Sequence, residues 1–442
     1  MAVTGTLSSG SDFTGISDAL KQRYEGPMAV NIEGEQEVLS AFEAVGDFET
    51  VEGSDGKQIN LGQYLSAGGG ISAMLENDYY PDNVAPGWLQ SNLTIKQIGA
   101  RVDLSGRAMR RAIAGPAAFA TWADMALTER AKRIAFHMDR MALGTGTGII
   151  GRINGTPDGT GDAMDDAFGI AGLGSASYLF MRDDTFRYSP NANGSSPRSG
   201  VVHVVRQNFG ADTFDTDLVG ALGTPATATS AADNDYVFLG SANVNGSGSR
   251  EITGLEAHLD DGTNVTTYQG VTRSSYPDVL YAQIINSTTS YGGVLSEDLL
   301  DAADSQCYER AYGKPDLLFG SRSGARSFWK SLKADRTLPD PQGQYQGGKK
   351  AKGLRVFLGD RQVELRAARK APISRWYGVD RTSFRRFKIG SGHWDNTTGA
   401  IWNRVIDSTG VKDAVYALWV QEEELACFHP ARSFKLTTLS AA

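Results

Sequence analysis

Glycine-rich and acidic stretches whose spacing could support ligand binding occur at several points of the 442-residue chain. Gly146-Thr147-Gly148-Ile149-Ile150-Gly151 matches the GxGxxG pattern of dinucleotide-binding loops. That motif must follow a strand and begin a helix, so that the pyrophosphate meets the helix N-terminus. Here it follows a predicted long helix and leads into the turn Asn154-Gly155-Thr156-Pro157. The pattern therefore predicts a tight chain reversal rather than a cofactor site.

The other candidate residues do not converge on a catalytic or metal site. Gly347–Lys352 has the wrong order for a P-loop and predicts an exposed basic loop, with weak phosphate binding as the alternative. The histidines are scattered, and Cys307 and Cys427 lie too far apart for a CxxC metal site. Acidic groups such as Asp183-Asp184 suit solvated or interface charges. We expect no catalytic residue, no metal, no cofactor, and a protein that is not an enzyme.

Basic and aromatic residues alternate around residue 380. Arg381, Arg385 and Arg386 lie close in sequence to Trp376 and Phe384. This mixture is found in nucleic-acid sites, but arginine and aromatic residues also dominate protein–protein interfaces. The formal net charge of −8 opposes unspecific coating of nucleic acid. The pattern favours a protein interface and leaves nucleic-acid binding as the alternative.

The net charge hides two strongly polarised segments. Residues 141–309 have a net charge of −14, and residues 310–404 have a net charge of +14. Such segments suit an acidic surface meeting a basic one, either within the chain or between copies of it. The alternative is a simple difference in composition between domains. Hydrophobic residues make up 40% of the chain, which is enough to bury a sizeable core.

The elements that would position these residues are mainly strands, with few helices. Pro116 and Gly144 bracket a segment without other Gly or Pro, which predicts one long helix over 116–143. Ser296 and the acidic residues after it predict a second helix over 296–312, and 323–333 is a third. Residues 53–108 indicate a long β-rich excursion. The segment from about 174 to 258 indicates a β-rich insertion.

The order of these elements resembles the major capsid protein of tailed double-stranded DNA bacteriophages, the Hong Kong 97-like fold. The similar stretches are Ala100–Ser105 leading into a helix, Asp139–Gly148 at the end of that helix, and Lys314–Phe319 before a Ser/Arg-rich helix. The resemblance implies an α+β capsid fold with an N-terminal arm, an extended β-hairpin loop, a long spine helix, peripheral and axial domains, and a β-rich insertion.

The resemblance also implies a division of the chain. The expected parts are the N-terminal arm (1–52), the extended loop (53–108), the spine helix and start of the peripheral domain (109–173), the insertion (174–258), the peripheral domain (259–295), the axial domain (296–410) and the C-terminal return to the peripheral domain (411–442).

The function implied is a structural subunit that self-assembles as hexamers and pentamers into an icosahedral shell enclosing the phage genome. The expected partners are other copies of the chain, scaffolding and portal proteins, a decoration protein and packaged DNA in weak non-specific contact, with no membrane. The implied location is the virion, after assembly in the bacterial host cytoplasm. The alternatives are an encapsulin-like cellular nanocompartment and a β-rich surface-binding protein.

A set of charged and aromatic residues is expected at subunit interfaces. Some members of the capsid family cross-link subunits through a lysine on the extended loop, but no matching asparagine or glutamate can be assigned, so no cross-link is predicted. The predicted interface residues are Lys57, Lys96, Arg101, Arg107, Arg110, Arg111, Trp88, Arg375, Trp376, Arg381, Arg385, Arg386, Glu422, Glu423 and Glu424.

Overall fold

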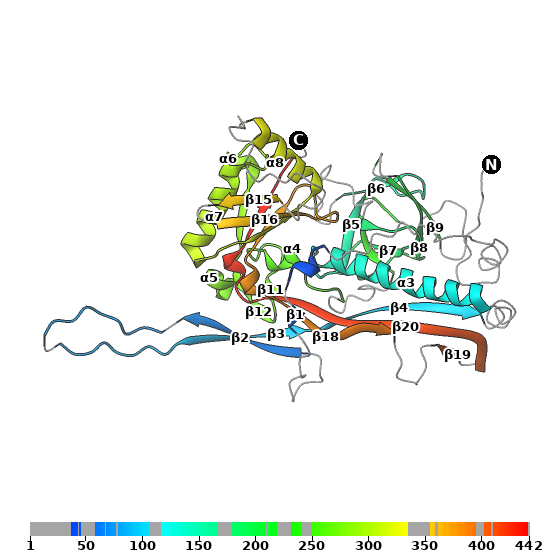
Figure 1. Ribbon diagram of the computed structural model, residues 1–442, viewed down its shortest axis with the longest axis horizontal. Coiled ribbons are helices and arrows are strands. Elements are labelled where there is room, and N and C mark those ends of the chain that lie inside the picture. Colours follow the sequence, from blue (N-terminus) through cyan, green and yellow to red (C-terminus); the bar gives the residue numbers. More distant parts are fainter. Residues whose placement is uncertain are drawn as a thin grey trace.

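The computed structural model describes most of the chain beyond residue 36. The described residues are 37–42, 44–45, 58–66, 68–76, 78–105, 116–165, 179–208, 211, 213–218, 231–240, 250–334, 354–358, 361–394, 402–407 and 410–440. They form an α+β fold with four parts: a long sheet beside one long helix, a six-stranded sheet with helices, a closed barrel, and a protruding hairpin (Figure 1).

The long sheet is built on the pairing of β4 (Lys96–Ser105) with β20 (Gly410–Cys427), which are antiparallel along the whole of β4. Val102 and Leu104 of β4 are buried while Arg101 and Asp103 are exposed, as the apolar–polar alternation predicts. The other strands of this sheet are β18 (Phe384–Trp394), β19 (Asn403–Asp407) and β1 (Ala44–Val45).

The predicted long helix is confirmed as α3 (Pro116–Met141), which lies along the long sheet (Figure 1). The C-terminal half of α3 buries Ile134, Met138 and Met141. These side chains belong to the same core cluster as Leu39 and Leu425, so this core joins the helix to the long sheet. The helix therefore acts as a rigid spine for the part of the molecule that it spans.

The six-stranded sheet runs in the order β13 (Gln283–Asn286), β21 (Phe434–Thr437), β17 (Trp376–Val379), β14 (Leu317–Gly320), β16 (Arg361–Ala367), β15 (Leu354–Leu358). The predicted second and third helices are confirmed as α7 (Glu297–Ala311) and α8 (Arg322–Ala334). The Ser296 hydroxyl accepts a hydrogen bond from the Leu299 amide and caps α7. Gly320 is required, since a Cβ there would lie 2.0 Å from the Trp376 ring.

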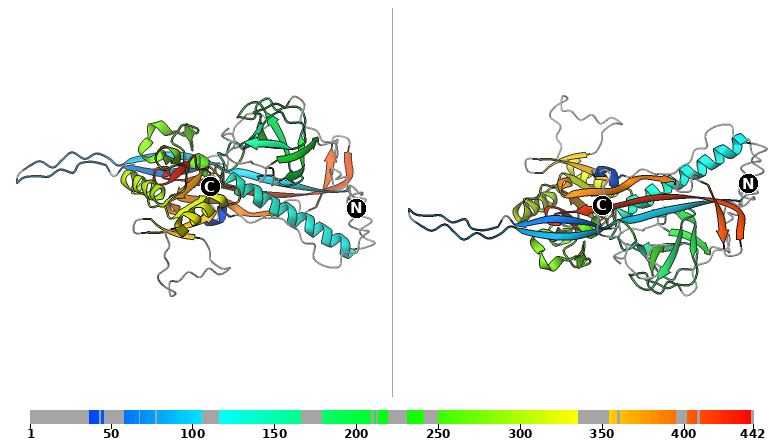
Figure 2. Two further views of the ribbon diagram at one scale, coloured as in Figure 1. Left: turned by 90° about the horizontal axis from the view of Figure 1, so that it is seen from above. Right: turned by 90° about the horizontal axis from the view of Figure 1, so that it is seen from below.

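A closed barrel is built from six strands that lie between residues 149 and 239. Its strands are β5 (Ile149–Asn154), β6 (Asp162–Asp165), β7 (Thr185–Ser189), β8 (Val202–Asn208), β9 (Thr213–Leu218) and β10 (Tyr236–Leu239), in the order β10-β5-β6-β9-β8-β7. Its interior is filled by aliphatic and aromatic side chains, with Phe180 stacked on Phe186 at 5.1 Å between ring centroids. Figure 2 shows the barrel lying to one side of α3.

Short elements connect these parts. They are η1 (Leu39–Ala41), α4 (Leu255–His258), β11 (Thr267–Tyr268), β12 (Val271–Thr272), η3 (Arg273–Ser275), α5 (Pro277–Leu280), α6 (Ser287–Ser290), η4 (Arg381–Ser383) and η5 (Pro430–Arg432). The buried Arg273 organises this region, because its guanidinium donates hydrogen bonds to the carbonyl oxygens of Asp260 and Leu280 at 2.6 and 2.7 Å. Among the described helices, none is both long and apolar enough to cross a membrane.

The observed parts differ from the predicted division at three places. The barrel begins at β5, well before residue 174, and its last strand ends at Leu239 rather than near 258. β18 and β19 fall within the segment 296–410 expected in the axial domain, but both belong to the long sheet. β21 falls within the predicted C-terminal return, but it lies in the six-stranded sheet. The physical reason is that strand pairing joins residues far apart in sequence.

Candidate assembly interface

The hairpin of β2 (Gln58–Ser66) and β3 (Gly87–Thr94) extends far beyond the rest of the molecule (Figure 1). At its base, Ile59, Leu61 and Leu93 are buried against Phe387 and Ala426 of the long sheet. The alternate residues of both strands face solvent, as the pleat requires. The base of the hairpin is therefore fixed to the subunit core, and its far end is held away from it.

Glycines allow the two arms of the hairpin to approach closely near its far end. Gly69 and Val84 exchange backbone hydrogen bonds of 3.1 and 3.4 Å. Gly68 has a φ of +81°, and a Cβ there would lie 2.2 Å from the Val84 carbonyl oxygen. Gly70 has a φ of +106° and faces the Asp82 carbonyl oxygen in the same way. Only glycine fits at these two positions without moving the backbone.

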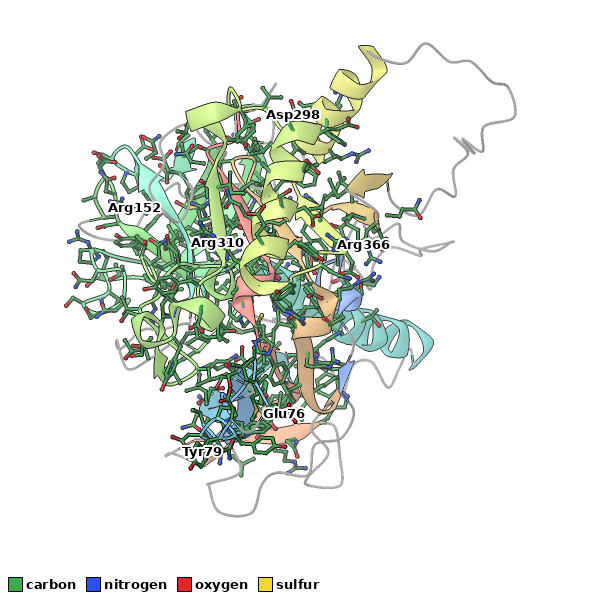
Figure 3. All side chains as sticks on the ribbon, turned by 90° about the vertical axis from the view of Figure 1, so that its left-hand side faces the viewer. Glu76, Tyr79, Arg152, Asp298, Arg310 and Arg366 are labelled. Atoms are coloured by element: carbon green, nitrogen blue, oxygen red, sulfur yellow. The ribbon has the colours of Figure 1, made fainter. Side chains whose placement is uncertain are left out.

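The far end of the hairpin exposes large apolar side chains. We call residues 70–76 and 78–83 the hairpin tip. Ile71 and Tyr79 are 99% and 98% exposed, Tyr80 is 86% exposed and Leu75 is 80% exposed. In Figure 3, which looks along the hairpin, Glu76 and Tyr79 lie well away from Arg310 of α7. Apolar groups gathered on a protruding element mark a protein–protein contact that the isolated chain leaves uncovered.

Six of the predicted interface residues lie at or near the surface. Trp88 is 67% exposed and stacks edge-on against Tyr64 along the hairpin. The Arg101 guanidinium pairs with Asp103 at 2.6 Å, and both side chains are about half exposed. The other four are Lys96, Arg381, Arg385 and Glu422, and each is half-buried. All six side chains are thus at least partly accessible in the single chain.

The prediction of a surface role is wrong for five other residues, which are buried within the subunit. They are Arg375, Trp376, Arg386, Glu423 and Glu424. The reason is that each charged member has a partner inside the same chain, which removes the need for water or a neighbour. The remaining predicted residues, Lys57, Arg107, Arg110 and Arg111, lie outside the described residues.

A buried ion pair joins two strands of the long sheet. Arg386 of β18 makes a bidentate pair with Glu423 of β20, and its Nη2 donates to Glu423 Oε2 at 2.9 Å. Gln421 Nε2 donates to the same carboxylate at 2.7 Å. A bidentate arginine–carboxylate pair fixes two strands in both register and angle. This pairing stabilises the part of the long sheet against which the base of the hairpin packs.

Glu424 lies on the opposite face of the same strand. Its Oε1 accepts a hydrogen bond from the Thr253 amide at 2.6 Å. Burial raises the pKa of Glu424 to about 8, although the Thr253 hydrogen bond and Lys96 act in the other direction. A carboxyl with this pKa is largely protonated at neutral pH, which suits its buried position.

The acidic and basic segments meet partly inside the subunit. Glu256 of the acidic segment lies 3.5 Å from Arg375 of the basic segment, and Asp304 pairs with Arg361 in the same way. Outside the acidic segment, Asp139 of α3 lies 3.3 Å from Lys370 Nζ and also accepts from the Val38 amide. Burial lowers the pKa of Lys370, and the neighbouring Asp139 opposes that shift. Part of the segregated charge therefore serves to join segments distant in sequence.

Ionic contacts also fasten the barrel to α3. Asp184, which precedes β7, lies 3.1 Å from both Arg133 Nη1 and His137 Nε2 of the helix. Burial alone would raise the pKa of Asp184, but His137 and Arg133 more than compensate and the pKa lies below its ordinary value. Within the barrel, His203 bridges Asp183 and Asp217. Its hydrogen bond to Asp183 is the main reason that its pKa is raised.

The candidate ligand motifs have structural explanations. The GxGxxG segment follows α3 and leads into strand β5, with Gly146 and Gly148 at φ of +78° and +89°, so it forms a reversal and begins no helix. Among the described residues, no group of three or more His, Cys, Asp or Glu side chains is arranged to hold a metal ion. Cys307 and Cys427 are buried and unpaired, and burial raises the pKa of both thiols.

The sequence reasoning missed the apolar residues of the hairpin tip. Ile71, Leu75 and Tyr79 are of types that normally enter a core, and their types alone give no sign that the hairpin exposes them. The available signal was the combination of three consecutive glycines with a polar-flanked apolar stretch. That combination is typical of an extended arm, which has too few neighbouring residues to bury its own apolar side chains.

Comparisons with known proteins identify the fold. No known family profile matches the sequence, and no curated protein matches it. Among solved structures, the chain is similar to the capsid asymmetric unit of cyanophage A-1(L), with a TM-score of 0.52 and 9% identity over 95% of this chain and 96% of that one. Weaker likenesses include the capsid of a native GTA particle, with a TM-score of 0.44 and 10% identity over 95% of both chains.

A further likeness is to the SrpI encapsulin of Synechococcus elongatus PCC 7942, with a TM-score of 0.40 and 8% identity over 97% of this chain and 96% of that one. Of these three likenesses, only the first has a TM-score above 0.5, and the fold assignment rests on it. The structure contains a protruding hairpin and a long helix, as the resemblance to the capsid fold implies. It also contains a long sheet and a six-stranded sheet. The chain has the Hong Kong 97-like capsid fold.

Proposed function

We propose that this chain is the major capsid protein of a tailed double-stranded DNA bacteriophage and assembles as hexamers and pentamers into the icosahedral shell around the genome. The observation that carries this proposal is the hairpin tip, on a chain with the capsid fold. Ile71 and Tyr79 are almost fully exposed. An isolated globular protein gains nothing from holding such side chains in water, whereas a shell subunit covers them on assembly.

The shape of the chain favours a closed shell. The hairpin projects from one end of the molecule, so the surface that receives it in a neighbour is a different surface (Figure 1). Such heterologous contacts close into rings when the rotation between copies is suitable. Because each subunit contacts several neighbours, individually weak contacts add up to a stable assembly.

We further propose a structural role without catalysis, in the virion. The buried ionisable groups support this role. Arg386, Glu423 and Glu256, for example, form internal pairs that stiffen the subunit. Scaffolding and portal proteins, and a decoration protein, are the proposed partners during and after assembly in the host cytoplasm. The packaged DNA would make weak, non-specific contacts.

Negative-stain imaging of the purified protein tests the proposal. We expect closed shells, or rings of five and six subunits. A variant lacking residues 70–83 should remain folded and fail to assemble. If the full chain stays monomeric under all assembly conditions, the proposal is wrong. Shells purified from infected cells should contain nuclease-protected double-stranded DNA, and a consistent protein cargo in its place would favour an encapsulin-like compartment.

A further inference from the structure

A lysine and an aspartate are buried side by side near the C-terminal end of α3. Asp139 of α3 is 0% exposed, and Lys370, in the loop between β16 and β17, is 6% exposed. Lys370 Nζ donates a hydrogen bond of 3.3 Å to Asp139 Oδ2. Figure 1 shows the short segment around Leu39, which completes this site, beside the same end of α3. The pair therefore lies where three segments distant in sequence meet.

The second oxygen of Asp139 accepts hydrogen bonds from two backbone amides. The Val38 amide donates to Oδ1 at 2.7 Å, and the Leu39 amide donates to the same atom at 3.4 Å. Both amides are held in place, because the side chains of Val38 and Leu39 are buried in the core cluster that includes α3. Two amides directed at one carboxyl oxygen stabilise the negative charge that develops there when a nucleophile attacks the carboxyl carbon.

The surroundings of Lys370 favour its action as a nucleophile. Burial lowers the pKa of Lys370, although Asp139 opposes the shift. A lysine amine that loses its proton more readily is a better nucleophile. The centroid of the Phe136 ring lies 4.2 Å from Nζ, and Phe136 is itself buried. The site thus holds little water that could compete with the amine.

A second carboxylate, from Glu37, borders the site. Its Oε2 accepts a hydrogen bond from the amide of Arg369, the residue before Lys370, at 2.9 Å. The negative charge of Glu37 also acts on the Lys370 amine. Because Glu37 is exposed, it can exchange protons with water. A carboxylate in this place can carry a proton between the amine nitrogen and a leaving oxygen.

We propose that Lys370 and Asp139 condense within the folded chain to form an amide bond between their side chains. A proton first passes from the Lys370 ammonium to Asp139 Oδ2 along their hydrogen bond. The nitrogen then bonds to Cγ, and negative charge collects on Oδ1 against the Val38 and Leu39 amides. The Cγ–Oδ2 bond breaks last, and Oδ2 leaves as water with a second proton from the nitrogen, carried by Glu37.

The reaction balances without any further reactant. Of the three ammonium protons of Lys370, two leave with the water and one stays on the amide nitrogen. The folded chain supplies the driving arrangement, since holding two groups in contact is equivalent to a very high local concentration. Each chain reacts once, so the bond is a self-modification and involves no turnover. The proposal does not depend on the proposed shell function.

A second buried lysine–carboxylate pair offers an internal comparison. Lys435 Nζ donates to Glu256 Oε1 at 2.8 Å, which is closer than the approach of Lys370 to Asp139. The other Glu256 oxygen, however, accepts from the Tyr377 hydroxyl and lies 3.5 Å from the Arg375 guanidinium. A second cation beside the carboxylate stabilises its ionised form, which an amine does not attack. We therefore expect this pair to stay an ion pair.

Mass spectrometry of the purified wild-type chain tests the proposal without any substitution. The intact mass should be lower than the sequence mass by one water, about 18 Da. Trypsin should release residues 134–140 joined to residues 370–375, because a modified Lys370 is no longer a cleavage site. The peptides that contain Glu256 and Lys435 should be unlinked. The full sequence mass, or a loss of water without the branched peptide, would overturn the proposal.

Matched variants identify the reacting groups. Lys370→Arg keeps a positive charge beside Asp139 and should show the full sequence mass, whereas the control Lys435→Arg should still show the loss of water. Glu37→Gln should slow the appearance of the branched peptide in newly synthesised chains by at least about tenfold. An unchanged rate would remove Glu37 from the mechanism, and loss of water from Lys370→Arg would contradict the assignment of the nucleophile.

The bond should also be visible in the denatured chain. It would join residues 231 positions apart and so restrict the unfolded chain to a closed loop. Wild type should therefore migrate faster than Lys370→Arg on a denaturing gel under reducing conditions, and equal migration would count against the bond. Unmodified chains that still form shells would refute the bond and leave the shell function intact. Joined chains that stay monomeric would contradict only the shell function.

Discussion

Replacing two aliphatic residues of the hairpin tip should abolish assembly without affecting folding. We consider the double variant Ile71→Ser/Leu75→Ser, because these side chains are 99% and 80% exposed in the single chain. Surface substitutions away from packed features change the free energy of unfolding by about 0.5 kcal/mol or less. The folded subunit should therefore be as stable as the wild type.

The expected effect on assembly follows from the area that a neighbour would cover. Full burial of a Leu or Ile side chain contributes about 1.5–3 kcal/mol. Two such residues give about 3–6 kcal/mol per hairpin, which weakens each contact by about 10²–10⁴-fold at 1.4 kcal/mol per tenfold. The effect on a whole shell is larger, since every subunit loses the same contact.

The assay compares folding and assembly in the same protein. Thermal unfolding of dissociated subunits measures folding, and light scattering with electron microscopy measures the concentration at which shells form. The control Asn60→Ser/Gln90→Ser alters exposed polar residues of the same hairpin. Unchanged assembly of Ile71→Ser/Leu75→Ser would refute the reasoning, because the exposed apolar tip would then have no role between subunits.

Three further predictions concern the stability of the subunit. Glu423→Gln leaves buried Arg386 without its counter-charge and should cost about 3–5 kcal/mol in chemical unfolding, whereas a cost as small as that of an exposed pair would contradict a structural role. The raised pKa of His203 means that its charged form stabilises the barrel fully below about pH 6.5 and loses effect as pH rises through the folded-state value; His203→Gln should flatten that decline. Glu424 holds its proton up to about pH 8 in the folded state but only to about 4.5 when unfolded, so stability should fall with rising pH across that window. Glu424→Gln should reduce this slope, and an unchanged slope would show that the carboxyl is not buried as described.

Local sequence signals were sufficient to predict the positions of the helices. Pro116 and Gly144 bracket α3, and Ser296 caps α7 in the way its sequence indicates. Such signals act within a few residues, so they survive without knowledge of the rest of the fold. The alternation of apolar and polar residues along β4 could also be predicted from the sequence, because its period of two depends only on the strand itself.

The barrel could not be delimited from local signals. β5 pairs with β10, and residues near 151 therefore lie beside residues near 237. No local pattern states which distant strand a segment will join. The same non-local pairing places β21 in the six-stranded sheet, next to β13 and β17.

Residue type alone also misplaced part of the interface. Arg386 and Glu423 are of types that usually face water, and only their pairing across β18 and β20 allows both to be buried. Conversely, Ile71 and Tyr79 are of types that usually enter a core, but the hairpin holds them in solvent. In both cases the location of a side chain is decided by a contact that is distant in sequence or absent from the isolated subunit.

A reconstruction of purified particles by electron cryo-microscopy tests the central claim most directly. The account predicts closed shells built from rings of five and six copies, in which each hairpin lies against the adjacent subunit and Ile71 and Tyr79 are covered. Particles without such rings, or shells in which the hairpin tip projects freely into solvent, would contradict it.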